Sequence, residues 1–441
     1  MFLETIRRGS VVAATLAALA LSNVASAFDP PPFPRVAGIQ IGGPFNYNDP
    51  AYQAALAKQS FMILSDYPTM APGGMSMQSI VQAIKAKNPA ALVFVYVNMN
   101  ELRADQATGT VWGPMRDKVS AMKWWLYTDG KMNSIVQGSF GIAGDQAVNT
   151  TLFTPKDSNG DTAVDWYTKY FVSTYYKPAP ALDGFFMDNA TWKPYIDGDF
   201  NRDGKIDSQN DPTVQSWFRQ GYAHYFQLVK TLMPGKLQLG NIGDWGTPSA
   251  TTPELQGLVN GGVLEGFIGK SWSVETWGGW TAMMNQYRKT MAGMAAPKLG
   301  IFNQWGSPTD YQAMRYGLGS CLLADAYYSF TDTSQGFHGV VWFDELDAKL
   351  GTAAAQPTAA WSKGVWRRDF DNGIVLVNPK GNGPQTVTLG GSFVKIKGKQ
   401  DSTTNDGQTV TTVTLKDRDG IILMRQTPVT RPDAPQKVTV E

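Results

Sequence analysis

With 441 residues the chain is long enough for one large domain and a smaller one, and its net charge of +1 gives no electrostatic basis for binding nucleic acid or another polyanion. One cysteine and two histidines exclude an intramolecular disulfide and a cysteine- or histidine-rich metal site, so catalysis would rest on carboxylates and needs no cofactor. The 14 tryptophans favour a carbohydrate partner, because indole faces stack on sugar rings, although such rings also fill large cores.

The first 27 residues have the features of a secretory signal peptide. Arg7 and Arg8 supply the positive charge, Val11–Leu21 the apolar stretch, and Ala25-Ser26-Ala27 the small residues of a cleavage site. The apolar stretch is short for a membrane-spanning helix, and no later segment is long and apolar enough to form one. We therefore expect a mature chain that begins at Phe28, has no membrane span, and is secreted or periplasmic.

Eight segments with β-propensity follow, and most of them precede a stretch with helical periodicity. This alternation predicts parallel strands joined by right-handed crossovers, and eight such units predict an α/β fold, a (β/α)8 barrel, over residues 28–355. The expected strands are Val36–Gly42, Phe61–Ser65, Ala91–Val97, Leu182–Met187, Lys236–Asn241, Val263–Ile268, Lys298–Phe302 and Tyr327–Phe330. The clearest helical patterns are Ser76–Lys87, Thr213–Leu232, Trp277–Ala292 and Asp310–Ala324.

The longest gap between expected strands covers residues 98–181 and is too long for a single crossover. It contains Trp112, Trp124, Trp125 and Trp166. This insertion either walls a substrate cleft or packs on itself as a surface subdomain, and the sequence favours the two equally.

The pattern changes near residues 351–360. Short alternating segments separated by Asn-Gly, Gly-Gly and Asp-Gly turns predict a small antiparallel β-sandwich at residues 360–426. Its expected strands are Ile374–Asn378, Gln385–Leu389, Thr409–Leu415 and Gly420–Arg425. Residues 427–441 are expected to form a loosely ordered tail.

Carboxylates follow several expected strands, at the edge where a barrel carries its active site. Asp188 ends the fourth strand in the apolar run LDGFFMDN, and Glu265 lies inside the sixth strand. Charged groups in such runs are costly to bury unless they are used or paired. A glycoside hydrolase needs one protonated and one ionised carboxyl group. We interpret Asp188 and Glu265 as this catalytic pair, with Glu265 as general acid/base; a buried ion pair is the alternative for Glu265.

Other side chains at the same edge are candidates for binding substrate. Asn189 either donates a hydrogen bond to a sugar or caps the segment that follows. The remaining candidates follow other strands and are the carboxylates of Asp66, Asp244 and Asp332 and the indoles of Trp245, Trp272 and Trp305.

The loop after the fourth strand has the spacing of a calcium-binding loop. Positions one, three, five and nine are Asp199, Asn201, Asp203 and Asp207, with a glycine at position six. Position twelve is Asn210, so the usual bidentate carboxylate is missing there. We interpret the loop as a structural Ca²⁺ site; the alternative is a solvated, turn-rich loop that binds no ion.

Taken together, these motifs resemble the hypothetical glycosyl hydrolases, (β/α)8 enzymes distantly similar to endo-α-1,4-polygalactosaminidases and to the α-galactosidase clan. The resemblance covers most of residues 36–426 and includes LDGFFMDN, DFNRDGKID, VLEGF, WFDELDAKLG and the C-terminal WRRDF and VNP. It implies glycoside hydrolysis, with Asp188 as nucleophile and Glu265 as acid/base. The α-galactosidase clan generally has an aspartate in the second role, so this chain departs from that pattern at Glu265.

Two classes of function remain in competition. The first is a secreted glycoside hydrolase that cleaves a polysaccharide or oligosaccharide with two carboxylates. The second is a non-catalytic carbohydrate-binding or envelope protein on the same scaffold. A calcium-dependent adhesion module ranks last, because only one such loop is present.

Overall fold

The structure is a computed structural model, and it describes residues 29–43, 45–65, 74–103, 105, 112–138 and 144–427. The expected signal peptide at residues 1–27, Asp66, and residues 428–441 of the expected tail lie outside the described residues.

Eight parallel strands form the central sheet, in the order β1-β2-β3-β6-β7-β8-β9-β10. They are β1 (Ala37–Gln40), β2 (Phe61–Leu64), β3 (Leu92–Val97), β6 (Gly184–Met187), β7 (Leu237–Asn241), β8 (Gly261–Ile268), β9 (Leu299–Gly306) and β10 (Tyr327–Asp332). The backbone N–H of Tyr328 donates to the Arg35 carbonyl at 2.8 Å, and Val36 pairs with Tyr328 in parallel, which brings the first strand to the last. The predicted (β/α)8 barrel and its eight strands are confirmed.

The strands are apolar on both faces because the barrel interior and the surrounding helices each cover one face. All four residues of β6 are buried, and β3 is a run of aliphatic and aromatic residues with the sequence LVFVYV. A strand of this kind has no solvated side, so its first polar side chains appear where it ends. That end is where the candidate site lies.

The helices between the strands include the four that the periodicity predicts, with small differences at their ends. They are α1 (Pro50–Leu56), α2 (Met77–Lys87), α3 (Gly113–Ala121), α4 (Ala163–Phe171), α5 (Pro212–Leu232), α6 (Val274–Ala292) and α7 (Tyr311–Leu322), with the shorter η2 (Val172–Tyr176), η3 (Pro253–Leu255) and η4 (Asp344–Asp347). Asp211 caps α5 by accepting a hydrogen bond from the Thr213 backbone N–H at 2.7 Å, and Pro212 fits its first turn.

The insertion after β3 combines the two arrangements that the sequence left open. It carries a two-stranded antiparallel sheet of β4 (Glu101–Arg103) and β5 (Asp145–Ala147), followed by α4, which packs on α5. Trp124 and Trp125 are buried inside it, whereas Trp112 lines the cleft described below. The segment therefore packs on itself and also forms one wall of the cleft.

The C-terminal region is a five-stranded antiparallel sheet in the order β11-β12-β15-β13-β14. Its strands are β11 (Trp366–Asp369), β12 (Gly373–Asn378), β13 (Gln385–Lys395), β14 (Thr409–Leu415) and β15 (Asp419–Arg425). The predicted small C-terminal antiparallel β-sandwich is confirmed as a separate antiparallel β region, whose described strands form one sheet. Its pairing register shifts between Thr388 and Phe393, and an apolar core lies on its inner face.

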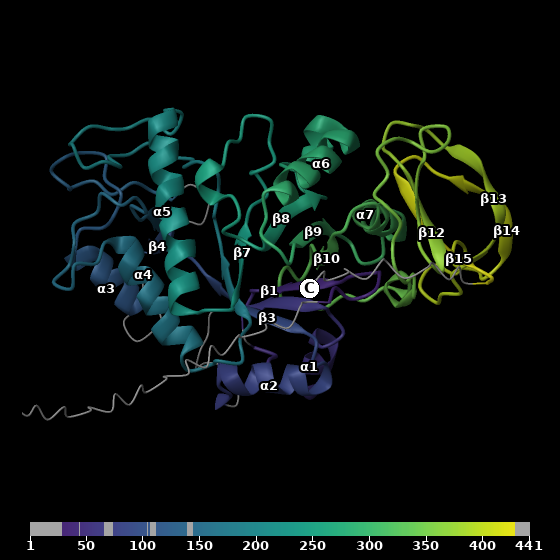
Figure 1. The fold of residues 1–441 in the computed structure, drawn as a ribbon, viewed down its shortest axis with the longest axis horizontal. Coiled ribbons are helices and arrows are strands. Elements are labelled where there is room, and N and C mark those ends of the chain that lie inside the picture. The colour runs from purple at the N-terminus through teal and green to yellow at the C-terminus, as the bar shows by residue number, and fades with distance from the viewer. Residues whose placement is uncertain are drawn as a thin grey trace, which may run out of the picture. The chain divides into compact units, whose positions relative to one another are not determined.

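This sheet packs on the barrel helix α7 (Figure 1). A Cβ atom added at Gly420 would lie 2.5 Å from the Arg315 carbonyl oxygen, so a glycine is needed where β15 crosses the helix. The buried guanidinium of Arg368 donates to the carbonyls of Leu322 and Ala324 at the end of α7. Barrel and sheet belong to one compact unit that begins at Pro31.

Two further expectations concern the described residues. No helix in this part of the chain is both long and apolar enough to cross a bilayer. Cys321 is a buried free cysteine in α7, as its apolar surroundings predict.

Candidate active site

A cleft of about 1250 Å³ opens at the C-terminal ends of the barrel strands. Asp188 follows β6, Asn241 ends β7, and Glu265 lies in the second half of β8, so three neighbouring strands deliver polar side chains to one place. The insertion adds Glu101 and Trp112 to the wall.

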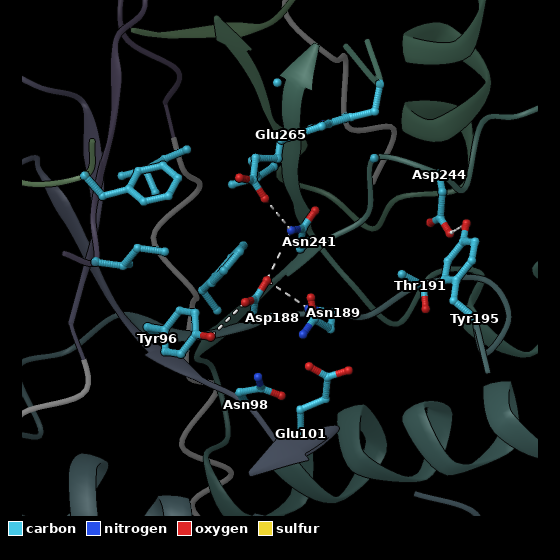
Figure 2. Close-up of a pocket in the computed structure, with 18 of the residues that line it drawn as sticks. Tyr96, Asn98, Glu101, Asp188, Asn189, Thr191, Tyr195, Asn241, Asp244 and Glu265 are labelled. Atoms are coloured by element: carbon cyan, nitrogen blue, oxygen red, sulfur yellow. Dashed lines mark hydrogen bonds between the residues drawn. The ribbon is translucent and has the colours of Figure 1, made fainter. Parts of the chain in front are cut away.

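Asp188 is held by three hydrogen-bond donors (Figure 2). Tyr96 donates its hydroxyl to Oδ2 at 2.7 Å, and Asn241 donates its side-chain amide to Oδ1 at 3.1 Å. The backbone N–H of Asn189 also donates to Oδ1, at 2.9 Å. Asn189 has a φ of +52°, a left-handed conformation that asparagine tolerates and that turns the chain sharply after the strand. The carboxylate is therefore fixed in one orientation at the centre of the cleft.

Glu265 occupies an irregular part of β8, between Leu264 and Ile268, where the pairing with β9 shifts. Its Oε2 accepts a hydrogen bond from the Asn241 side-chain amide at 3.0 Å. Burial raises the pKa of Glu265, and the nearby Asp188 carboxylate adds to the rise; the Asn241 hydrogen bond and Lys270 lower the pKa in part. Glu265 thus retains its proton more readily than an ordinary glutamate.

Asn241 joins these two carboxyl groups (Figure 2). Its amide nitrogen donates to both of them, so the two acceptor oxygens can lie no more than about 6 Å apart. Such an arrangement favours one ionised and one protonated carboxyl group, because two negative charges at this separation repel each other.

A third carboxyl group, that of Asp244, faces the cleft at one side of this pair (Figure 2). Tyr195 donates its hydroxyl to Asp244 Oδ2 at 2.8 Å, and the Trp192 backbone N–H donates to the same oxygen at 3.3 Å. Burial raises the pKa of Asp244 to about 7, although the Tyr195 hydrogen bond acts in the opposite direction. Asp244 therefore changes its charge near neutral pH.

Two exposed tryptophans line the cleft. The side chains of Trp272 and Trp277 are 57% and 61% exposed, although indoles are usually largely buried. The Trp277 indole N–H donates to the Trp272 carbonyl at 3.1 Å, so the two residues are held together at the start of α6. Both rings present apolar surface to whatever the cleft binds.

The structure brings most of the predicted site residues together. Asp188 and Glu265 share Asn241, and Asn189, Asp244 and Trp272 line the same cleft.

Three predicted substrate-binding residues do not line this cleft. Trp245 is 3% exposed and donates its indole N–H to the Ala190 carbonyl, so it belongs to the core. Trp305 packs edge-on against Phe337, with the ring centroids 5.0 Å apart. Asp332 is buried and accepts hydrogen bonds from the backbone and the hydroxyl of Ser334, so it stabilises a turn after β10.

Sequence reasoning missed several residues that the structure places at the cleft, among them Tyr96, Tyr195, Asn241 and Trp277. Tyr96 and Asn241 each lie in the last two residues of an apolar strand, and a polar group in that position is a detectable signal. Tyr195 lies in the loop after β6, where the local pattern gives no direction for the side chain, and Trp277 lies in the first turn of α6, whose periodicity does not show that this turn borders the cleft.

The predicted calcium loop does not form a ready-made metal site. Among the described residues, no group of three or more His, Cys, Asp or Glu side chains is close enough to hold an ion. Instead, Asp199 accepts a hydrogen bond from the Gly204 backbone N–H at 3.0 Å, and Asp207 accepts from Phe200 at 2.9 Å. Asn201 and Asp203 accept from backbone N–H groups two residues further along.

Comparison with known proteins gives a match at the level of the family. The sequence profile of hypothetical glycosyl hydrolase family 15 matches residues 85–374, more than half of the chain. No curated protein matches the chain.

Solved structures with a related architecture are distant. The glycoside hydrolase domain of PelA from Pseudomonas aeruginosa is 12% identical, with a TM-score of 0.42 over 70% of this chain and 98% of that one. An α-amylase from Geobacillus thermoleovorans, complexed with acarbose, is 9% identical, with a TM-score of 0.46 over 89% and 99%. A GH31 dextranase from Flavobacterium johnsoniae, complexed with glucose, is 11% identical, with a TM-score of 0.46 over 90% and 52%. Identities this low give no information on what this chain binds or cleaves.

Proposed function

The chain belongs to hypothetical glycosyl hydrolase family 15 and is thus a glycoside hydrolase, and we propose that it cleaves a polysaccharide with Asp188 and Glu265 as its two catalytic carboxyl groups. The observation that carries the proposal is the Asn241 amide, which donates to both groups and keeps them within reach of one glycosidic bond.

The spacing of the pair favours a retaining mechanism. Catalytic carboxyl groups lie about 5–5.5 Å apart in retaining glycosidases and about 6.5–9.5 Å apart in inverting ones, and the limit of about 6 Å set by Asn241 supports the former. Asp188 attacks the anomeric carbon and forms a glycosyl ester, while Glu265 gives its proton to the departing oxygen. Glu265 then accepts a proton from the water that hydrolyses the ester.

Electrostatics supports this division of roles. The raised pKa of Glu265 suits a group that must enter the reaction protonated. Asp188 has three donors directed at its two oxygens, which position it for attack. The pair works without a cofactor.

The size and lining of the cleft support a polymeric substrate. A volume of about 1250 Å³ exceeds what a single sugar ring needs, since pockets for drug-sized ligands span about 300–1,000 Å³. Trp272 and Trp277 add exposed rings on which further sugar units can stack.

The test is product release from a panel of bacterial and plant polysaccharides by the wild type and by Asp188→Asn. We expect new oligosaccharides from the wild type and a loss of about 10⁴-fold in kcat in the variant. Asp145→Asn is the matched control, because Asp145 lines the same cleft from β5 without contacting the pair. Binding of a polymer without any product would instead indicate a non-catalytic carbohydrate-binding protein.

We also propose that the 199–207 loop binds Ca²⁺ in a structural role. Asp199 is 4% exposed, and its Oδ1 is buried without a hydrogen-bond partner within the described segments, so an acceptor is available there for a cation. The unfolding temperature should rise with calcium concentration in the wild type and stay constant in Asp199→Ala. No rise at millimolar calcium would refute the site.

Export to the periplasm or the medium is the corresponding proposal for residues 1–27. Arg7 and Arg8, the apolar stretch and the Ala25-Ser26-Ala27 site support it. N-terminal sequencing of protein recovered from the culture medium or periplasm should begin at Phe28; an intact Met1 on exported protein would contradict cleavage.

A further inference from the structure

Asp244 is a half-buried residue in the cleft, with a buried carboxyl oxygen Oδ1, and the proposed cleavage does not use it. It follows β7, and Figure 2 shows it beside Tyr195, to one side of the Asp188 and Glu265 pair. No hydrogen bond joins it to either catalytic carboxyl group among those the structure gives for Asp244.

The two oxygens of this carboxyl group have different surroundings. Oδ2 accepts two hydrogen bonds, one from the Tyr195 hydroxyl and one from the Trp192 backbone N–H. Oδ1 is buried and has no hydrogen-bond partner in the part of the chain that the structure describes. A buried acceptor without a donor is costly, and native structures leave few such atoms unless a ligand or water supplies the donor.

We propose that Asp244 and Tyr195 form a sugar-binding subsite, in which ionised Asp244 accepts at Oδ1 a hydrogen bond from a hydroxyl or N–H group of a substrate unit. This inference rests on the proposed function, because it assigns the occupant of the same cleft. Tyr195 and the Trp192 N–H hold Oδ2, which leaves Oδ1 for the substrate.

The same geometry makes the subsite sensitive to pH. Because Oδ2 already accepts two hydrogen bonds, the proton that Asp244 takes up resides on Oδ1, and it blocks the acceptor. The titratable or charged groups that act on Asp244 are Tyr195, Lys193 and Tyr222. Burial raises the pKa of Asp244 to about 7, and Lys193 and the Tyr195 hydrogen bond oppose the rise. Substrate binding through this subsite should therefore strengthen as pH rises through neutrality.

The first test follows the carboxyl group itself and needs no substrate. In protein labelled with ¹³C at aspartate carboxyl carbons, one resonance should titrate near neutral pH and vanish in Asp244→Asn. In Tyr195→Phe the same titration should move to higher pH, because a donor that stabilises the ionised form is lost. A purely structural Tyr195 would leave the midpoint unchanged. Absence of the titration from wild type, or a downward move in Tyr195→Phe, would overturn the proposal.

The second test measures binding in a Glu265→Gln background, which removes the neighbouring group whose pKa is also raised. The probes are hexose and N-acetylhexosamine tetrasaccharides, measured by calorimetry. For the probe that binds, affinity should rise about tenfold between about pH 6 and about pH 8, as the ionised fraction of Asp244 rises. This rise in affinity should be absent when Asp244→Asn is combined with Glu265→Gln in one chain. It should persist when the matched control Asp145→Asn is combined with Glu265→Gln instead.

The two proposals fail in different ways. Hydrolysis or binding that has the same pH dependence with and without Asp244→Asn overturns the subsite and leaves the glycosidase intact. Suppose instead that Asp244 titrates near neutral pH as expected, but neither probe binds and no polymer yields product. That result counts against the polysaccharide substrate, and against the subsite as well, because its proposed occupant is then absent.

Discussion

Glu265 and Asp244 face the same cleft from the ends of neighbouring strands, yet their neighbours differ. Glu265 shares the Asn241 amide with Asp188, so a second carboxylate lies within about 6 Å. Asp244 meets a phenol and a backbone N–H, and both donate to one of its oxygens. Burial is the largest cause of the raised pKa in both groups.

The comparison separates the cause of a raised pKa from its use. Burial raises the pKa of a carboxyl group, and it does so at both positions. At Glu265 that proton lies near a carboxylate that can attack a sugar, which suits acid catalysis. At Asp244 there is no reacting partner, and the acceptor left at Oδ1 suits binding. Variants of the two groups should therefore change different kinetic constants.

Among the variants that test this comparison, Glu265→Gln should have the largest effect. We expect kcat to fall about a thousandfold, because the leaving oxygen loses its proton donor. The alkaline limb of the kcat profile, caused by deprotonation of Glu265 as pH rises, should vanish. Parallel measurements with a dinitrophenyl glycoside test this role directly. Its leaving group departs without protonation, so the rate of the first step should fall far less in Glu265→Gln with this substrate. Equal losses on both substrates would contradict acid catalysis by Glu265.

Asp244→Asn should change how stability depends on pH. An ordinary aspartate releases its proton near pH 4, whereas folded Asp244 keeps it until about pH 7. The folded state then binds more protons than the unfolded state across that window, so this group lowers the unfolding free energy as pH rises. The total decline should be a few kcal/mol in wild type and should be missing from Asp244→Asn in urea titrations. A matching decline in both proteins would mean that Asp244 titrates normally.

The barrel and the catalytic pair could be predicted because both depend on local pattern. A strand buried on both faces is a continuous apolar run, and Asp188 is the first charged residue after such a run. The direction of side chains beyond a strand end could not be predicted in this way. Trp245 was expected at the cleft, but its backbone N–H bonds to the Ile242 carbonyl in a turn, and its indole enters the core.

The connections within the site could not be predicted for a related reason. Asn241 reaches Asp188 across 53 residues of sequence, and Tyr96 reaches it across 92. Each contact depends on the register between strands, which the sequence of a single strand does not specify. The same holds for Tyr195 and Asp244, whose pairing is set by how the loop after β6 folds back toward β7.

Asn241→Ala should have an intermediate effect, and it tests the comparison by changing the contacts of the Asp188 and Glu265 pair. The Asn241 hydrogen bond lowers the pKa of Glu265, so its loss should raise that pKa and move the alkaline limb of kcat to higher pH. We expect kcat to fall about tenfold, because Asp188 also loses a donor. Asn98→Ala is the control, because Asn98 lines the cleft but accepts a hydrogen bond from the Asn100 backbone N–H. The alkaline limb of kcat should not move in this variant.

Trp277→Ala should have the smallest effect and should act on binding alone. Loss of the exposed ring should raise KM for a polymer about fivefold, with kcat and the pH profile unchanged. Trp277→Phe separates stacking from the brace that the indole N–H gives to the Trp272 carbonyl: it keeps a ring and removes the hydrogen bond. If stacking is the contribution, the KM of Trp277→Phe should stay close to that of wild type.

Trp361→Ala is the matched control, because this indole is 38% exposed but lies outside the cleft lining, and its KM should equal that of wild type. A KM that rises equally in the Phe and Ala variants would assign Trp277 to bracing the loop, and sugar recognition would then depend on the polar groups of the cleft.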